Sequence, residues 1–416
     1  MESVYEAIII GGGPAGASTA ILLAQAGWSV ALVEKQRFPR RKVCGECIAA
    51  PNLPLLDALG VGAAFADLAG PELRRIGVFA GGRILSAELP RFGDGRYPWG
   101  RALGREYLDD LLLQRAAEAG ACVWQPWGAR EIGWDCGSYH CRVQSLGSGV
   151  HRALVAPVLV AADGSWEPCL WARSRVPRRP GDLFAFKANF LDCDLDPGLL
   201  PVLAFPGGYG GMVVADHGRV TMACCIRRDA LQRCRDRHPR AKAGECIQEY
   251  LQESCLGVRR ALSGAKREGV WLSAGPVRPG IRATWGKDGV YMAGNAAGEA
   301  HPIIGEGISM AIQAASLLSE QLVSHRAGLL SGRAIVGAGQ EYAFRWRNSF
   351  AARIRASALL ANLAMRPGAA APLLPLLQRW PTVLTRTARM SGKVRPLVTQ
   401  ATRARTLEYT HTEGLR

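Results

Sequence analysis

The N-terminal stretch places two short apolar runs on either side of one helical pattern. Ala7–Ile10 is apolar, mostly β-branched and too short for a helix, so it predicts a buried parallel strand. Ala17–Ala26 is rich in alanine and leucine with helical periodicity, and a second apolar run, Val30–Val33, follows it. This order predicts a strand, a helix and a second strand at the start of an α/β domain.

Three glycines between the first strand and the helix follow a G-x-G-x-x-G spacing. Gly11 allows the tight turn, Gly13 leaves room for a pyrophosphate at the backbone, and Gly16 lets the helix lie close to the strand. The helix N-terminus adds free N–H groups and a positive dipole end. Glu34, at the tip of the second strand, can accept hydrogen bonds from ribose hydroxyls and disfavours a 2′-phosphate. The unit predicts binding of an ADP-containing dinucleotide; the alternative is a glycine-rich turn in an unrelated α/β unit.

Alternating patterns follow further along the chain. Residues 74–98 and 184–227 alternate apolar and polar residues around glycines, which predicts antiparallel strands. Asp216-His217-Gly218 predicts a hairpin turn inside the second stretch. These segments indicate a second, antiparallel sheet domain.

Helical and strand-like patterns return between and after these segments. Residues 101–120 are amphipathic with helical spacing, and Leu154–Asp163 reads as one more apolar strand. Gly289–Glu320 runs from a short strand through a glycine-rich turn into a long helix that begins near Ile308. Ala343–Arg416 contains two helical patterns that are apolar on one face and rich in arginine on the other. We expect them to form a cap over a substrate pocket, an interfacial membrane surface, or a helix pair packed on the first domain.

Length and composition limit the class of protein. A chain of 416 residues is long enough for two or three domains, and no apolar run is long enough to span a bilayer. The first strand begins almost at Met1, which leaves no room for a signal peptide. The twelve cysteines have no framework spacing, which favours a reducing compartment. We therefore expect a cytoplasmic protein with possible membrane association.

The net charge of +16 points at first to nucleic acid or an anionic membrane. However, 44 of the 51 basic residues are arginines spread along the whole chain. They form no basic run interleaved with aromatic residues and no nucleic-acid motif. Nucleic-acid binding is therefore not expected.

Two segments resemble the geranylgeranyl reductase-like flavoproteins, within the superfamily of p-hydroxybenzoate hydroxylase-type FAD enzymes. FPRRKVCGECI, residues 38–48, resembles the F-P-R-x-K-x-C-G segment that passes the flavin in that family. GNAAGEAHPIIGEGI, residues 294–308, closely resembles the segment G-D-A-A-G-x-x-x-P-x-x-G-E-G-I, with Asn295 in place of the aspartate. Residues 101–120 resemble the superfamily helix that brings an arginine, here Arg105, near the flavin; an ordinary surface arginine is the alternative.

The resemblance implies FAD as the cofactor and NAD(P)H as the expected reductant. Here the Gly-rich start of the helix near Ile308 would face the flavin and stabilise its anionic reduced form. The motifs together give the expected FAD-binding residues: Gly11, Gly13, Pro14, Ala15, Gly16, Glu34, Lys35, Arg41, Lys42, Cys44, Gly45, Arg105, Asp163, Gly294, Asn295, Pro302, Gly305, Gly307 and Ile308.

The sequence also departs from the family at two places. The prenyl reductases have a Y-x-W-x-F-P motif at the substrate pocket, but Tyr209 is followed here by Gly-Gly-Met-Val. The superfamily has Ser and Arg after its Asp-Gly pair, whereas Glu167 and Leu170 follow Asp163 here. The first departure weakens a prenyl-reductase interpretation, and the second leaves the handling of NAD(P)H open.

Three side chains are candidates for catalysis. His301 beside the glycine-rich turn could act as an acid or base, Tyr209 could line the substrate pocket, and Cys44 could form a redox pair with Cys47. A structural role is the alternative for each of them. No metal site is expected, because the Cys44-x-x-Cys47 pair has no second pair of ligands at a suitable spacing.

The sequence as a whole predicts an α/β protein with a Rossmann-like FAD-binding domain, an inserted antiparallel β-sheet substrate domain and a helical C-terminal extension. The FAD-binding domain is expected to comprise residues 1–70, 101–170 and 275–340. The substrate domain is expected at 71–100 and 171–274, and the C-terminal extension at 341–416. The expected activity is NAD(P)H-dependent hydroxylation of an apolar aromatic or polyketide-like substrate. The alternatives are reduction of a carbon–carbon double bond in an isoprenoid or other lipid, flavin-dependent halogenation, and a non-enzymatic flavoprotein that carries a lipid or docks on a partner.

Overall fold

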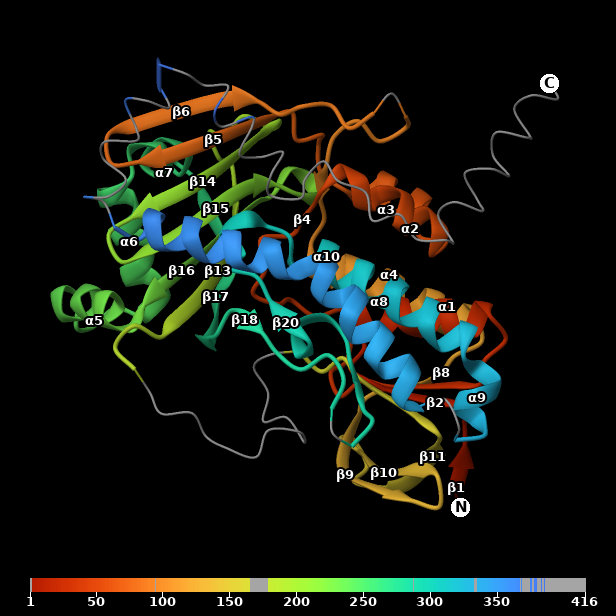
Figure 1. Cartoon of the computed structure of the whole chain (residues 1–416). Coiled ribbons are helices and arrows are strands. Elements are labelled where there is room, and N and C mark those ends of the chain that lie inside the picture. The colour runs from red at the N-terminus through yellow and green to blue at the C-terminus, as the bar shows by residue number, and fades with distance from the viewer. Residues whose placement is uncertain are drawn as a thin grey trace.

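A computed structural model describes residues 2–93, 95–164, 179–286, 288–332 and 335–366, with isolated positions up to 385 (Figure 1). Within these residues no helix is long and apolar enough to cross a membrane. Glu167, Leu170 and most of the predicted second C-terminal helix lie outside the described residues.

The first layer is a parallel five-stranded sheet. Its strands are, in spatial order, β19 (Tyr291–Met292), β12 (Val158–Ala161), β2 (Ala7–Ile10), β3 (Val30–Val33) and β8 (Cys122–Trp124). The strands predicted over Ala7–Ile10 and Val30–Val33 are confirmed, and all their residues are buried because both faces of the sheet are covered. The mixed α/β fold is therefore confirmed.

Helices cover one face of this sheet, and a small second sheet covers the other. The helices are α1 (Pro14–Gln25), α4 (Arg105–Glu118), α8 (Gly307–Ser324) and α10 (Ile335–Ala364). The predicted helix over 17–26 begins three residues early, since Pro14 suits the first helical position. The small sheet has the order β1 (Glu2–Val4), β11 (His151–Ala156), β10 (Ser138–Ser145) and β9 (Trp127–Asp135).

The single strand predicted over Leu154–Asp163 is wrong. Pro157 divides it into β11 of the small sheet and β12 of the parallel sheet, because proline cannot donate a ladder hydrogen bond. The two halves pair with different neighbours: β11 with β1 and β10, and β12 with β2 and β19.

The third sheet has seven strands and lies beside the parallel sheet (Figure 1). In spatial order they are β17 (Lys266–Val277), β13 (Leu183–Leu191), β16 (Val220–Arg227), β15 (Gly208–Val214), β14 (Leu199–Phe205), β5 (Arg75–Ala80) and β6 (Arg83–Glu88). The hairpin at Asp216–Gly218 is confirmed between β15 and β16. The sheet is mixed rather than antiparallel as predicted, because β14 and β5 run parallel.

Three helices that the sequence patterns did not reveal cover the back of this seven-stranded sheet. They are α5 (Arg228–Arg237), α6 (Ala243–Ser254) and α7 (Leu256–Ala261). The α5 sequence, RDALQRCRDR, buries only Ala230 and Cys234, so its apolar stripe is too narrow to stand out. Short elements complete the chain: β4 (Cys47–Ile48), α2 (Leu53–Ala58), α3 (Gly62–Leu68), β7 (Arg101–Ala102), β18 (Gly280–Ile281), β20 (Gly298–Glu299) and α9 (Arg326–Leu330).

The domain limits stay a prediction, but one of them falls inside a continuous helix. The seven-stranded sheet draws its strands from residues 75–88 and 183–277. The limit drawn between residues 340 and 341, however, falls inside α10, which runs without interruption from Ile335. We therefore treat α10 as one continuous element.

Candidate functional site

A cavity lies where the parallel sheet and the front face of the seven-stranded sheet meet. It is lined by the glycine loop before α1, the segment 42–47, the start of α8 and strands β14 to β16. The structure brings fifteen of the predicted site residues to it: Gly13, Pro14, Ala15, Lys42, Cys44, Gly45, Arg105, Tyr209, Gly294, Asn295, His301, Pro302, Gly305, Gly307 and Ile308. The other six do not line it: Gly11, Gly16, Glu34, Lys35, Arg41 and Asp163.

The glycines of the loop before α1 are of two kinds: at one a side chain would collide with the backbone, and at another it would extend into the cavity. A Cβ on Gly16 would lie 1.8 Å from the carbonyl oxygen of Gly11, so only glycine allows this contact between helix and strand. A Cβ on Gly13 would instead meet only Arg105 Nη2, at 3.8 Å. Glu34 Oε2 accepts a hydrogen bond of 2.8 Å from the N–H of Gly12 and so lies directly against the loop. Gly13 therefore leaves the backbone open to a ligand in the cavity.

Two cations lie at this end of the cavity. The buried Arg105 donates from Nε and Nη2 to the carboxylate of Asp109, at 2.6 and 2.7 Å. Burial alone would lower the pKa of Arg105, but Asp109 outweighs it and raises that pKa. Lys42 has no ion pair among the described residues, and burial, reinforced by Arg105 and Arg40, lowers its pKa to about 8. The cavity thus has an excess of positive charge next to Gly13.

Arg41 lies outside the cavity and does not face this charge. Its Nε donates to Glu106 at 3.1 Å and its Nη2 to Glu268 at 2.9 Å. Because the guanidinium already has two carboxylate partners, the structure gives no support to the prediction that Arg41 binds the cofactor.

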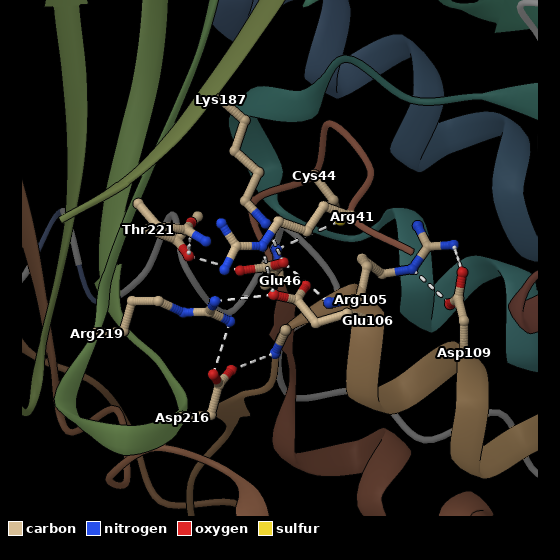
Figure 2. A network of polar contacts seen from close by, with 12 residues as sticks. Arg41, Cys44, Glu46, Arg105, Glu106, Asp109, Lys187, Asp216, Arg219 and Thr221 are labelled. Atoms are coloured by element: carbon tan, nitrogen blue, oxygen red, sulfur yellow. Dashed lines mark hydrogen bonds and ion pairs between the residues drawn. The ribbon is translucent and has the colours of Figure 1, made fainter. Parts of the chain in front are cut away.

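A buried polar network connects the segment 42–47 to the seven-stranded sheet (Figure 2). Glu46 forms an ion pair with Lys187, and the two side chains are 0% and 1% exposed. Glu46 also accepts from the N–H of Arg105 at 2.9 Å and from Thr221 Oγ1 at 2.5 Å. Glu46 has a backbone φ of 61°, a value that residues other than glycine rarely adopt. Its hydrogen bonds therefore hold a strained backbone at the wall of the cavity.

Local sequence patterns do not reveal that Glu46 and Lys187 form a pair. The only signal was a lysine inside the apolar strand FAFKANF, where a buried charge requires a partner. Its partner is 141 residues away in the chain, so no local pattern reveals it.

A second set of ionic contacts continues the network below Glu46 (Figure 2). Arg219 Nη1 donates to Glu106 at 2.8 Å, and its Nη2 pairs with Asp216 at 2.6 Å. Asp216 in turn accepts from the N–H of Gly104 at 2.6 Å, immediately before α4. The turn between β15 and β16 is thereby fixed to the helix that carries Arg105.

Tyr209 and His301 form the polar end of the cavity on the sheet side. The Tyr209 hydroxyl lies 3.0 Å from Nδ1 of His301. Burial raises the pKa of Tyr209 well above its ordinary value and lowers the pKa of His301 to about 4, so both side chains are neutral at pH 7. His301 Nε2 has no hydrogen-bond partner among the described residues, which leaves one ring nitrogen available to a ligand.

Small side chains form the floor of the cavity beside this pair. Gly211 pairs with Ala223 of β16 and with Val202 of β14, so these three residues share one face of the sheet. A Cβ on Gly211 would meet only the Pro201 carbonyl oxygen, at 3.3 Å. All of these residues line the cavity, and their small size leaves space above the strands.

Cysteines add no metal centre or disulfide to the site. Neither Cys44 nor Cys47 forms a disulfide, and Cys44 Sγ accepts a hydrogen bond of 3.3 Å from the N–H of Glu46. No group of three His, Cys, Asp or Glu that could hold a metal ion occurs in the described part of the chain.

The residues of the cavity fit FAD. Gly13 leaves an open backbone, Lys42 and Arg105 supply positive charge for a diphosphate, and the N-terminus of α8 opens onto the cavity through Gly307. Gly305, with a φ of 64°, forms the turn before this helix. The individual FAD contacts stay predictions.

Comparisons with known proteins agree with this geometry. The family profile described as FAD binding domain matches residues 4–337. Digeranylgeranylglycerophospholipid reductase 2 of Methanothermobacter thermautotrophicus is 27% identical over 375 residues, covering 85% of this chain and 86% of that protein. The menaquinone reductase of Mycobacterium tuberculosis is 29% identical over 168 residues, which is 40% of each chain.

Several solved structures have the same fold as this chain. The flavin-dependent brominase Bmp2 superposes with a TM-score of 0.73 at 18% identity, covering 99% of this chain and all of that one. PqsL of P. aeruginosa, solved in complex with 2-aminobenzoylacetate, superposes with a TM-score of 0.67 at 20% identity over 90% of this chain and all of that one. These structures share the fold of this chain, and the family profile over residues 4–337 confirms the superfamily that the motifs indicated.

Proposed function

Because the chain belongs to the FAD binding domain family, we propose that it is an FAD-dependent oxidoreductase that uses NAD(P)H and O₂ to hydroxylate an apolar aromatic or polyketide-like substrate. In such a reaction the substrate exchanges one C–H bond for C–OH, the other oxygen atom leaves as water, and NAD(P)H is oxidised to NAD(P)⁺. The bound FAD supplies electron transfer from NAD(P)H and the activation of O₂.

The observation that carries this proposal is the neutral Tyr209–His301 pair beside a floor of small residues. A flat ring fits above Gly211 and Ala223, and a ring hydroxyl or carbonyl can hydrogen-bond to the free ring nitrogen of His301. A plain hydrocarbon chain offers no group for this nitrogen. The polar pair therefore favours an oxygen-bearing aromatic substrate.

The two neutral side chains can orient such a substrate in either of two proton arrangements. If Tyr209 donates to Nδ1 of His301, Nε2–H of the imidazole donates to a substrate carbonyl or phenolate oxygen. If Nδ1–H donates to Tyr209, Nε2 accepts a hydrogen bond from a substrate hydroxyl. In both cases the substrate ring is held at one orientation over the sheet.

The experiment supplies FAD-loaded protein with NADPH or NADH, ¹⁸O₂ and a panel of alkyl-substituted phenols and resorcinols. The proposal expects a product that contains one ¹⁸O atom and one NAD(P)H consumed per product, measured by mass spectrometry and absorbance. NAD(P)H oxidation that yields only hydrogen peroxide with every member of the panel, together with turnover of a polyprenyl compound, would contradict it.

The second candidate is reduction of a carbon–carbon double bond in an isoprenoid or other lipid. Cys44, Gly45 and Glu46 of the C-G-E segment all line the cavity, and a relative that covers 85% of this chain carries the name of a reductase. This reaction adds a hydride and a proton across the double bond and needs no O₂. Under anaerobic conditions with NADPH, a polyprenyl substrate that gains two hydrogen atoms would favour it over hydroxylation.

A further inference from the structure

Helix α10 lies beside both sheets, although most of it lies beyond the part of the chain that the family profile matches (Figure 1). Near its start, the Tyr342 hydroxyl donates to the carbonyl of Met292 in the parallel sheet at 2.8 Å. In its middle, Arg353 donates to Gln313 of α8 at 3.0 Å. Just past its end, the carbonyl of Met365 accepts from the N–H of Gly207, in the turn between β14 and β15 of the seven-stranded sheet, at 3.1 Å. The helix is thus attached on both sides of the cavity.

Between these attachments, α10 touches the segment that carries His301. Ser357 is fully buried, and its Oγ accepts a hydrogen bond of 2.9 Å from the N–H of His301. The same hydroxyl donates to the carbonyl of Ile354 at 2.7 Å. Because a serine hydroxyl has one proton, the bond to Ile354 directs an oxygen lone pair at His301. The hydroxyl is therefore oriented as an acceptor.

Trp346 of α10 lines the cavity and packs against the other end of the same segment. A Cβ on Gly298 would lie 2.5 Å from its ring, so the backbone of β20 rests directly on the indole. Pro302, immediately after His301, has no N–H of its own. The stretch from Gly298 to His301 is thus held between an aromatic ring and a hydroxyl of one helix.

We propose that Ser357 is a positioning residue that sets the orientation of the His301 imidazole toward the substrate. This role rests on the proposed function only in that His301 is taken to contact the substrate. Without the hydroxyl, the His301 N–H loses its acceptor, and among the described residues the ring keeps its one hydrogen bond, to Tyr209. The imidazole then samples several orientations, while the predicted FAD contacts at Gly13, Lys42 and Arg105 are untouched.

The first test observes the ring directly and needs no substrate. The seven histidines of the FAD-loaded chain are labelled with ¹³C at Cε1, and the His301 signal is assigned by its absence in His301→Asn. We expect Ser357→Ala to shift or broaden this signal and leave the other assigned histidine signals in place. The matched control is Ser349→Ala: Ser349 also lies on α10, but within the described part of the chain its hydroxyl bonds only to the carbonyl of Arg345, at 2.9 Å. An unchanged His301 signal in Ser357→Ala, or an equal change in Ser349→Ala, overturns the proposal.

The second test asks whether Ser357 acts through His301. With the phenol that gives the most product, Ser357→Ala should lower kcat by about 10- to 100-fold at unchanged FAD content. In the His301→Asn background the same substitution should have almost no further effect. An equal loss in both backgrounds overturns the proposal, because Ser357 would then act independently of His301. If no phenol is hydroxylated, the proposed function fails, while the labelled-histidine experiment still decides the role of Ser357.

Discussion

The hydroxyl of Tyr209 and Nδ1 of His301 lie 3.0 Å apart, although 92 residues separate them in the chain. One comes from the middle of the seven-stranded sheet and the other from the turn before α8. Their contact joins the two walls of the cavity at the place where a substrate oxygen would bind.

Tyr209→Phe keeps the ring and removes this contact. We expect product formation from a phenol to fall by about 100-fold or more, because Nδ1 of the imidazole loses its hydrogen-bond partner and the ring is no longer held toward the substrate. The visible absorbance of FAD should be unchanged. Tyr250→Phe is the matched control, since its hydroxyl donates to the carbonyl of Pro206 at 2.9 Å and does not line the cavity. Equal rates in Tyr209→Phe and the unaltered protein would exclude Tyr209 from the reaction.

His301 should make the free energy of unfolding depend on pH below about pH 6.5. Burial lowers its pKa to about 4 in the folded protein, against about 6.5 in the unfolded chain. As the pH falls from about 6.5 to 4, the unfolded chain takes up a proton that the folded protein does not, so the free energy of unfolding decreases. His301→Asn should lose less stability than the unaltered protein over this range, measured by urea unfolding at each pH. Substitution of the exposed His151 is the control, and it should leave the dependence intact.

Lys42 should make FAD binding depend on pH on the basic side. Burial lowers its pKa to about 8, and a bound diphosphate favours the charged form. FAD binding therefore takes up a proton once the pH exceeds about 8, and the affinity should fall by at most about tenfold per pH unit. Fluorescence titration of the FAD-free protein measures this dependence. Lys42→Met should bind more weakly and show a flatter profile, whereas Lys266→Met, 80% exposed, should behave like the unaltered protein.

Breaking the buried pair of Glu46 and Lys187 should destabilise the fold far more than breaking a surface pair. Lys187→Met leaves the carboxylate of Glu46 buried with one cation fewer, which should cost about 3–5 kcal/mol of unfolding free energy. Adding Glu46→Gln should recover part of that loss. The exposed pair of Arg142 and Glu131 is the control, and Arg142→Met should cost less than about 1 kcal/mol. A similar cost at both places would mean that Lys187 has no special role.

Two glycines of the same loop should respond differently to valine. Gly13→Val should fold normally but purify without flavin, because its side chain would extend into the open space where we expect the diphosphate to bind. Gly16→Val should fail to fold, since its Cβ would collide with the backbone of Gly11. Circular dichroism and visible absorbance separate the two results, and a fully yellow Gly13→Val protein would contradict the placement of FAD.

The sequence allowed the parallel strands, the glycine loop and the superfamily to be predicted, because each depends on residues that are close together in the chain. The apolar run Ala7–Ile10 and the glycines that follow it predict a strand and a tight turn from local sequence alone. The same holds for the turn before α8, where Gly305 and Gly307 follow one another closely.

Features made by distant segments could not be predicted in this way. Arg41 resembles a family position, but it pairs with Glu106 and Glu268 and does not line the cavity. Ser357 has no sequence signal, since its meaning depends on His301, 56 residues earlier. The parallel pairing of β14 with β5 likewise depends on contacts that strand periodicity does not encode.

The position of α10 at the end of the described fold has a consequence for synthesis on the ribosome. The glycine loop and both main sheets are complete once about residue 292 has been made, but Trp346 and Ser357 follow much later. A nascent chain that stops before α10 has both walls of the cavity without the helix that joins them. We therefore expect the last folding event to be the docking of α10, and premature chain termination in that helix to leave a protein with secondary structure and no working site.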